Sequence, residues 1–365
     1  MELILFAILL LPFAYYINLF ANAWKFLNTK EIKKSILPTG TKVTVIVPFK
    51  DATEQLLVWL ASFENLPLAD QVEVLLINDG SVNSLMKLRK KLASDGKKNI
   101  KLVDRIHRGK KSSIEYGVSI ARGEIIICTD ADTRPGRCWI EGILETFSDE
   151  NIQMVCGRVA PANGQWFAAI DFMALMAAGE VLIKKQKPVM CSGSHMAFRR
   201  GAFMDVNGYK GYHHFASGDD VILLYKIKEK FGPESIGFND YRESYVVTDM
   251  PISLGQLLSQ RQWWGGKAIY YRDVFSLLLS VLVLYCSLMT YGIFFIAIPS
   301  VPLVLMALVI VLTKAWVDVR IIYKYAREVH HPVKPWQVAA ATLLYPIFMA
   351  IVFLRILVNP NPRWG

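Results

Sequence analysis

The hydrophobic positions of the chain form two kinds of pattern. Four long apolar runs cover residues 3–20, 274–298, 301–319 and 336–358. Runs of about 18 or more apolar residues are typical of membrane-spanning helices, although a buried core helix can give the same pattern. Between residues 40 and 250 the apolar runs are short and alternate with segments of helical period. The pattern therefore predicts about four transmembrane helices together with an α/β domain.

The α/β domain is predicted to contain a mostly parallel sheet with flanking helices, because strands and helices alternate along it. We expect strands at 43–48, 72–77, 100–103 and 124–129, and helices at 55–65, 84–94 and 111–122. Ligands of such sheets bind at the carboxyl ends of the strands. The charged residues at or just after these strand ends are Lys50, Asp51, Asp79, Asp130 and Asp132. The candidate ligand site of the domain is therefore at this edge of the sheet.

The acidic residues Asp130 and Asp132 lie two and four residues after the apolar run 125–128. On an extended backbone residues i and i+2 share a face, so both carboxylates leave the strand end in one direction. Two close carboxylates repel each other unless a cation lies between them, and a divalent cation shared with a phosphate is the usual solution. A lone pair of this kind is more often a plain acidic turn, so the interpretation depends on the other motifs.

Three other segments have both a chemical and a plain interpretation. Asp79 can accept hydrogen bonds from a ribose or a base edge, or it can simply form an Asp-Gly turn. Residues 109–113 precede a helix whose N-terminal amides and basic side chains can hold a diphosphate, although a basic turn is more often just solvated. Asp219 and Asp220 begin a helical segment, where Asp220 can act as a general base and helix capping is the alternative.

Composition strengthens the membrane interpretation. Of the 365 residues 53% are apolar, which is high for an ordinary soluble protein. The net charge is +10, but Lys and Arg are spread out and partly flank apolar runs, which favours membrane surfaces and phosphates over nucleic acid. The five cysteines contain no CxxC pair, so neither a zinc site nor a disulfide framework is indicated. A reduced, cytosolic environment fits best.

Basic residues follow the first apolar run and fill the predicted loop before the last one. They are Lys25, Lys30, Lys33, Lys34, Arg320, Lys324, Arg327 and Lys334. With four spans both basic segments lie on one side, which the positive-inside rule makes the cytoplasm. Residues 21–23 resemble a signal-peptide cleavage site, but no positive charge precedes the first run, which favours a retained anchor. Lys314 and Asp318 are four residues apart in a helical segment and can pair.

These patterns predict four parts of the chain. They are an N-terminal transmembrane helix (1–24), the α/β domain (40–250), an amphipathic interfacial segment (251–272) and three C-terminal transmembrane helices (273–365). Residues 165–183 also have apolar positions at helical spacing and a basic end. We expect that helix either to lie on the membrane surface or to pack beneath the ligand site.

Seven motifs occur in a common order between residues 43 and 267: PFKDAT, INDGS, HRGKKSSIEYG, TDAD, CSGSHMAFRR, SGDDVILL and SQRQWWGGK. Each motif is weak alone, but the seven in order are highly specific. In this order the chain resembles the inverting glycosyltransferases of family 2, which have a GT-A nucleotide-sugar-binding fold.

The resemblance implies roles for individual residues. Asp51 and Asp79 are implied to contact the nucleoside, and Asp130 and Asp132 to hold Mg²⁺ or Mn²⁺ against the diphosphate. Asp220 is implied to be the general base. The other residues implied in donor binding are Pro48, Lys50, Lys110 and Ala131.

The chain departs from the family pattern at two places. Asp219 stands where the family more often has Glu, and we expect it to orient Asp220. In QRQWW, Trp stands where related synthases carry Arg, so Arg261 or Lys267 is expected to hold the diphosphate instead. Gln260, Trp263 and Trp264 are expected at the acceptor or diphosphate, with interfacial anchoring as the alternative for both tryptophans. His195 is either an acceptor or phosphate contact or a structural histidine.

Together these features lead us to expect a multi-pass inner-membrane glycosyltransferase with its catalytic domain on the cytoplasmic side. The expected partners are a nucleotide sugar, taken to be a UDP-sugar, a lipid or saccharide acceptor, and the membrane, but not nucleic acid. A lipid-linked acceptor is the leading hypothesis and a processive polysaccharide synthase the second. A catalytically inactive membrane scaffold is the alternative from outside enzymology. A transporter is disfavoured, because the charged residues of the apolar runs lie towards their ends.

Overall fold

The structure is a computed structural model that describes residues 2–32, 42–81, 85–215, 218–265 and 273–359. It divides into two compact units. The sheet unit comprises residues 29–162 and 178–249, and the helix unit comprises residues 1–28, 163–177 and 250–365. Residues 163–177 lie inside the stretch predicted to be the α/β domain, but their contacts group them with the helix unit.

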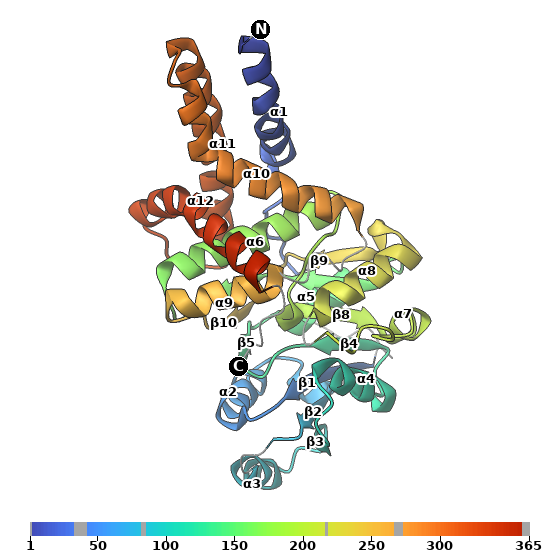
Figure 1. The fold of residues 1–365 in the computed structure, drawn as a ribbon. Coiled ribbons are helices and arrows are strands. Elements are labelled where there is room, and N and C mark those ends of the chain that lie inside the picture. The colour runs from blue at the N-terminus through green and yellow to red at the C-terminus, as the bar shows by residue number, and fades with distance from the viewer. Residues whose placement is uncertain (1, 33–41, 82–84, 216–217, 266–272, 360–365) are drawn as a thin grey trace. The chain divides into compact units, whose positions relative to one another are not determined.

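The sheet unit is built on a seven-stranded sheet in the order β3-β2-β1-β4-β8-β6-β9 (Figure 1). Its strands are β1 (Val43–Phe49), β2 (Glu73–Asp79), β3 (Ile100–Arg105), β4 (Ile125–Cys128), β6 (Met154–Gly157), β8 (Met196–Arg199) and β9 (Ile236–Asn239). The first four pair in parallel, as does β6 with β9, whereas β8 runs antiparallel to both its neighbours. The predicted mostly parallel sheet is confirmed, and the reversed strand β8 is an addition to it.

Every residue of β1 is buried, because the strand lies in the middle of the sheet and is covered on both faces. The helices of the unit are α2 (Thr53–Phe63), α3 (Met86–Asp95), α4 (Lys110–Ile120), α5 (Trp139–Thr146), α7 (Arg200–Asp205) and α8 (Asp219–Phe231), with short 3-10 turns η2 (Ala69–Gln71), η3 (Gly193–His195) and η4 (Pro233–Ser235). The aromatic side chains of Trp59, Phe63 and Trp139 anchor the hydrophobic core. The helices predicted at 55–65, 84–94 and 111–122 match α2, α3 and α4 to within about two residues.

A second, three-stranded sheet has the order β5-β10-β7. Its strands are β5 (Thr133–Pro135), β10 (Val246–Thr248) and β7 (Val159–Pro161). Each has three residues, too few to leave a period-2 signal in the sequence, so none was predicted. Because β5 begins one residue after Asp132, this sheet fixes the path of the chain as it leaves the acidic pair.

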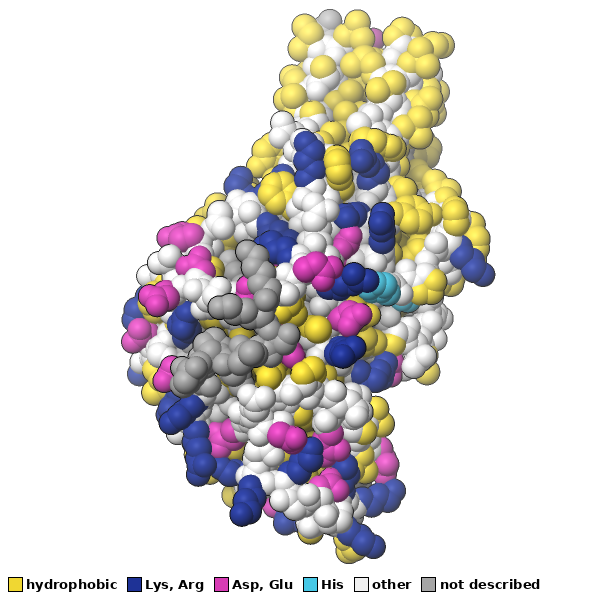
Figure 2. Space-filling model, turned by 180° about the vertical axis from the view of Figure 1, so that it is seen from behind, with side chains coloured by type: hydrophobic (Ala, Val, Ile, Leu, Met, Phe, Trp, Pro, Cys, Tyr) yellow, Lys and Arg dark blue, Asp and Glu magenta, His cyan; other side chains and the backbone are white. Residues whose placement is uncertain are grey.

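The helix unit contains the predicted apolar helices. Its elements are α1 (Glu2–Phe20), η1 (Ala23–Lys25), α9 (Leu254–Gly265), α10 (Val274–Ala297), α11 (Val301–Glu328) and α12 (Pro335–Val358). Between 17% and 28% of the most apolar windows of α1, α10, α11 and α12 is buried, and these helices are long and apolar enough to cross a membrane. Hydrophobic side chains cover the surface of this unit at the top of Figure 2.

Helix α6 (Trp166–Lys184) meets the same length and hydropathy criteria, but 78% of its window is buried inside the protein. Its residues up to 177 belong to the helix unit and the rest to the sheet unit. Of the two expectations for this segment, packing within the protein therefore describes α6 better than lying on a membrane surface. Periodicity alone cannot separate a buried helix from a spanning one.

Helix α11 is longer than predicted. Arg320, Lys324 and Arg327 were expected in a loop, but they lie on the last turns of the helix. Lys and Arg are good helix formers, and the Lys324 ammonium pairs with Glu328 one turn later at 2.5 Å. The predicted pair of Lys314 and Asp318 is confirmed at 2.6 Å on the same helix. The tyrosine hydroxyl of Tyr16 on α1 also donates to Asp318 at 2.7 Å.

Candidate active site

The predicted site residues of the α/β domain come together at the carboxyl ends of β1, β2 and β4. Lys50 and Asp51 follow β1, Asp79 is the last residue of β2, and Asp130 is the second residue after β4. Parallel pairing of the three strands brings their ends to one edge of the sheet, as expected. Lys110 at the start of α4, and Asp219 and Asp220 at the start of α8, complete the group within the sheet unit.

Lys110 is the central charge of the site. Its ammonium lies 2.8 Å from Asp130 Oδ1 and 2.9 Å from Asp219 Oδ2. Burial opposes a charge here, but the two carboxylates together raise the pKa of Lys110 well above its usual value. Burial likewise acts to raise the pKa of Asp130, yet Lys110 and a hydrogen bond from Ser194 leave it lowered. Lys110 was predicted only as a diphosphate contact, so its link between Asp130 and Asp219 is new.

Asp220 has the environment of a general base. Its carboxylate accepts the backbone N–H of Gly193 at 3.0 Å and that of Val221 at 2.8 Å. Burial, and then the neighbouring charge of Asp219, raise the pKa of Asp220 to about 6. A carboxylate with this pKa is ionised at neutral pH and is still basic enough to accept a proton.

Helix capping does not account for Asp219 and Asp220. The residue that caps α8 is Gly218, whose φ of +80° is a left-handed conformation that glycine adopts readily, and no side chain makes the capping hydrogen bond. Asp219 and Asp220 instead occupy the first turn of the helix. Negative charge is favoured there by the helix dipole, which offsets part of the cost of burying both groups.

Asp132 differs from Asp130 in its surroundings. Its side chain is exposed, while Asp130 is partly buried and engaged on both oxygens. Partial enclosure by the protein and the charge of Asp130 raise the pKa of Asp132. Within the described residues no cluster of three or more His, Cys, Asp or Glu side chains is placed to hold a metal ion. Two carboxylates fit a cation of the Mg²⁺ type, which commonly takes its other ligands from a phosphate and water.

Asp79 is saturated by protein donors. Its Oδ1 accepts the backbone N–H of Arg108 at 3.0 Å and the Ser113 hydroxyl at 3.1 Å, and its Oδ2 accepts the N–H of Gly109 at 3.0 Å. Oδ2 also lies 2.7 Å from Nδ1 of His107. Asp79 thus fixes the turn that leads into α4 and to Lys110. This structural role was not predicted, and the expected contact of Asp79 with a nucleoside stays a prediction.

Replacing Asp79 with Asn should loosen this turn, because an amide offers one acceptor oxygen where the carboxylate offers two. Hydrogen bonds to charged groups contribute about 1.5–3 kcal/mol, and we expect a loss of stability in that range. Amide hydrogen exchange should accelerate in residues 107–113. Asp70→Asn is the matched control, because Asp70 is exposed and makes only a surface ion pair with Lys97. Equal exchange in both variants would contradict the role of Asp79.

The remaining predicted donor residues are divided between core and surface. Pro48 lies inside β1 and is buried, and Ala131 is part of the hydrophobic core. Lys50 and Asp51 are exposed. Asp51 has a φ of +52°, uncommon for a residue with a side chain, and its N–H donates to the Ser81 hydroxyl at 2.9 Å. Asp51, which follows β1, and Ser81, which follows β2, therefore lie side by side.

Comparison with known proteins finds a family match for part of the chain. The profile described as "Glycosyl transferase family 2" matches residues 44–206, which include the strand ends, Lys110 and the acidic pair. Residues 44–206 therefore resemble a family 2 glycosyltransferase domain. The match ends before Asp219 and Asp220, so the assignment of the base depends on their geometry.

Two proteins similar to parts of this chain are named as enzymes that transfer or polymerise sugars. The chain is 29% identical to a cholesterol galactosyltransferase from Borreliella burgdorferi, over 32% of each chain. It is 25% identical to a poly-beta-1,6-N-acetyl-D-glucosamine synthase from Staphylococcus aureus, over 57% of this chain and 50% of that one. The chain thus spans between a third and a half of the length of these two relatives.

A solved structure confirms the GT-A fold. It is a mannosyltransferase from Pyrobaculum calidifontis in complex with GDP-Man and Mn²⁺. The two structures superpose with a TM-score of 0.57 over 98% of each chain, at 17% sequence identity. At this identity the similarity concerns the fold, and the site of the glycosyltransferase domain rests on its own residues.

His195 of the glycosyltransferase domain is buried and has protein partners on both ring nitrogens. Nδ1 lies 2.9 Å from the carbonyl oxygen of Arg158, and Nε2 lies 3.2 Å from the side-chain amide of Asn239. Burial lowers the pKa of His195 to about 4, so the ring is neutral at physiological pH. Of the two expectations for His195, this placement favours the structural role over contact with an acceptor or phosphate.

The QRQWW motif lies on α9 in the helix unit. Arg261 is buried there and pairs with Asp171 of α6 at 2.6 Å, and its guanidinium lies over the ring of Trp264. Its Nη1 also donates to Gln260 at 3.1 Å. The guanidinium thus has internal partners, while its expected contact with a diphosphate stays a prediction, as do the acceptor contacts of Gln260, Trp263 and Trp264. Lys267 lies outside the described residues.

Proposed function

We propose that the protein transfers a sugar from a nucleotide-sugar donor to a hydroxyl group of a membrane-associated acceptor, with inversion at the anomeric carbon. The observation that carries the proposal is the half-buried cluster in which Lys110 joins Asp130 to Asp219, beside Asp220 with its raised pKa. A carboxylate suited to proton transfer and a cation suited to phosphate binding then lie near an acidic pair at the strand ends where such sheets bind ligands, which supports the proposal.

The reaction is a single displacement. Asp220 accepts the proton of the acceptor hydroxyl as its oxygen forms the new bond to the anomeric carbon, and the bond to the diphosphate oxygen breaks on the opposite side. Lys110 contributes positive charge near the departing diphosphate. A Mg²⁺ or Mn²⁺ ion held by Asp130 and Asp132 would neutralise more of that charge. Asp219 holds Lys110 in place and keeps the pKa of Asp220 raised.

The donor is proposed to be a nucleoside diphosphate sugar. A metal-bound diphosphate leaving group suits UDP-sugars, and GDP-Man is bound in the similarly folded mannosyltransferase, so both bases belong in the test. Helices α1, α10, α11 and α12 support attachment to a membrane, with the glycosyltransferase domain on the cytoplasmic side by the positive-inside rule. An acceptor linked to a lipid fits a domain held at the bilayer.

A processive polysaccharide synthase is the second candidate. The similarity to the poly-beta-1,6-N-acetyl-D-glucosamine synthase favours it, although that match covers half of the synthase. Four exposed apolar helices are few for a dedicated polymer channel in addition to an anchor, and we therefore place the lipid-linked acceptor first.

The test uses the full-length protein in membranes, supplied with labelled UDP- and GDP-sugars in the presence of Mg²⁺ or Mn²⁺. We expect one donor to give nucleoside diphosphate release and a labelled product that extracts into organic solvent with lipids. Membranes that carry the Asp220→Asn variant serve as the background. A long, water-soluble labelled polymer would favour the synthase. Absence of release with every donor, with lipid extract added, would favour an inactive scaffold.

A further inference from the structure

Two consecutive residues, Gly193 and Ser194 of η3, contact two different carboxylates of the proposed active site. The backbone N–H of Gly193 donates to Asp220 Oδ2 at 3.0 Å, and the hydroxyl of Ser194 donates to Asp130 Oδ2 at 2.8 Å. We call these two residues the bracket. It connects the acidic group after β4, on the donor side, with the proposed base at the start of α8.

The bracket fixes the orientation of the Asp130 carboxylate. Lys110 takes Oδ1 and Ser194 takes Oδ2, so the carboxylate cannot rotate without losing a contact. The main chain of the bracket is held as well, because the Thr129 hydroxyl donates to the carbonyl oxygen of Ser194 at 2.7 Å. A cation that binds Asp130 would therefore meet oxygens already held in direction, which lowers the cost of ordering them.

The buried ring of His195 supports the bracket from behind. Since the ring is neutral and Asn239 donates to Nε2, Nδ1 carries the proton and donates to the carbonyl oxygen of Arg158. Asn239 is held in turn by the Ser244 hydroxyl at 2.8 Å. The ring packs so closely against Gly157 that a Cβ there would lie 2.1 Å from it. These contacts hold the His195 ring in one place, and Ser194, the preceding residue in the chain, is held with it.

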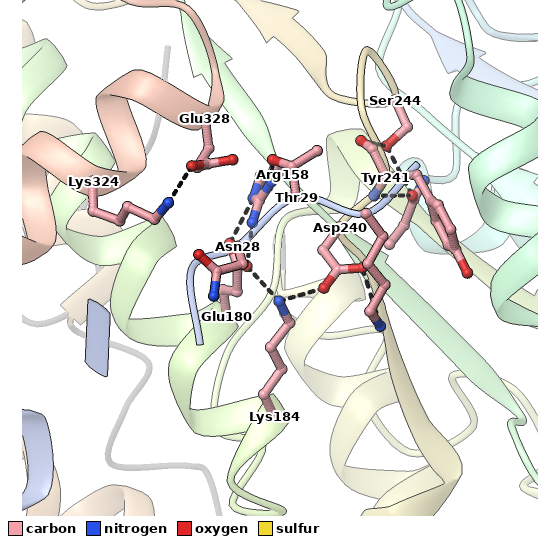
Figure 3. Close-up of polar contacts among 12 residues, drawn as sticks. Asn28, Thr29, Arg158, Glu180, Lys184, Asp240, Tyr241, Ser244, Lys324 and Glu328 are labelled. Carbon is pink, nitrogen blue, oxygen red and sulfur yellow. Dashed lines mark hydrogen bonds and ion pairs between the residues drawn. The ribbon is translucent and has the colours of Figure 1, made fainter. Parts of the chain in front are cut away.

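Arg158 provides a rigid base for this contact. Figure 3 shows its guanidinium against Glu180, with hydrogen bonds of 2.8 and 2.6 Å, and against the Thr29 hydroxyl at 2.8 Å. Lys184 joins Glu180 to Asp240 at 2.8 and 2.6 Å. Because the buried charges are paired, the network resists displacement of the Arg158 main chain.

We propose that Ser194 is a positioning residue for the Asp130 carboxylate, and that the bracket sets the spacing between the donor-side acid and the base. The inference rests on the proposed function, because it takes Asp130 as a cation ligand. Residues that hold a metal ligand in place commonly change metal affinity by about 10- to 100-fold when they are replaced. Ser194 should therefore affect cation binding itself, in addition to turnover.

The test measures binding of Mn²⁺ to the full-length protein, from the signal of free Mn²⁺ in electron paramagnetic resonance, with UDP or GDP present. Ser194→Ala is expected to weaken Mn²⁺ binding by about 10-fold or more. Ser194→Thr keeps the hydroxyl and should restore most of the affinity. Ser119→Ala makes the same chemical change on the exposed end of α4 and should leave binding unchanged.

The outcomes separate this inference from the proposed function. Wild-type affinity in Ser194→Ala would overturn the role of Ser194 while leaving the proposed function standing. Failure of the wild-type protein to bind Mn²⁺ would instead count against the cation site of the proposed function. If Ser194→Ala does not fold, Thr129→Val gives a second route to the bracket, and it should weaken Mn²⁺ binding less than 10-fold but measurably. Unchanged affinity in Thr129→Val would then overturn the inference.

Discussion

Replacing Asp220 with Asn is expected to lower the turnover number by about two to four orders of magnitude, the usual contribution of a positioned general base. An amide cannot accept the proton of the acceptor hydroxyl, although its oxygen can still accept the N–H of Gly193. Because the carboxylate acts on the acceptor, the KM for the nucleotide sugar should change little. The measurement is nucleoside diphosphate release at saturating donor and acceptor.

The pH dependence gives a second readout of the same group. Burial and Asp219 raise the pKa of Asp220 to about 6, so the carboxylate becomes protonated as the pH falls through that value. A protonated Asp220 cannot accept a proton, and kcat/KM of the wild-type protein should decline below a pH of about 6. This acid limb should disappear in the residual activity of Asp220→Asn.

Asp205→Asn is a suitable control for both measurements, because Asp205 is an exposed carboxylate on α7. It should retain wild-type turnover and the acid limb. Wild-type turnover in Asp220→Asn would assign the proton transfer to another group. Asp219 would then be the next candidate, since its buried carboxylate directly precedes Asp220 on α8 and pairs with Lys110.

The sequence predicted the parts of the fold that local patterns determine. The apolar strand at Val43–Phe49 and the acidic pair after Ile125–Cys128 were both predicted, from short runs of β-forming residues that end at turn-forming or charged residues. The antiparallel strand Met196–Arg199 was not predicted, because four residues are too few to give a clear strand pattern. Its insertion between β4 and β6 brings the end of η3 next to Asp130.

The connections within the site depend on contacts between residues far apart in the chain. The pairing of Lys110 with Asp130 and Asp219 joins three elements, and no local spacing indicates it. Basic residues before a helix instead suggested a phosphate contact, which the same lysine can still make. Similarly, a lone histidine in the sequence gives no signal of burial, so the choice of the structural role for His195 depended on its contacts with Arg158, Asn239 and Gly157.

The order of the seven motifs predicted the family better than any single residue did. Seven weak motifs in order predicted the family 2 domain that the profile match over residues 44–206 supports. The departures from the family pattern were the least predictable positions. Arg261 was expected to take over a missing arginine, and the structure gives it Asp171 and Trp264 as partners within the helix unit. A motif records residue types, whereas the partner of a long cationic side chain depends on tertiary packing.

Replacing Asp132 with Asn is expected to abolish most of the dependence of activity on Mg²⁺ or Mn²⁺. One of the two carboxylates available to the cation is lost, and metal stabilisation of a departing phosphate contributes several kcal/mol, which corresponds to about 10²- to 10⁴-fold in rate. Asp132 is the cleaner site for this change, because it is exposed, whereas Asp130→Asn would also leave Lys110 with Asp219 alone. The measurement is turnover as a function of Mn²⁺ concentration after treatment with a chelator.

The pKa of Asp132 adds a condition to this experiment. Because partial enclosure and the charge of Asp130 raise that pKa, the wild-type protein should bind Mn²⁺ more weakly as the solution becomes more acidic, since protons compete for the carboxylate. Asp132→Asn should lose this part of the pH dependence. Asp205→Asn again provides the control with the same change on an exposed surface. If Asp132→Asn kept the wild-type response to Mn²⁺ at every pH, Asp132 would not be a ligand and the cation would have to bind elsewhere.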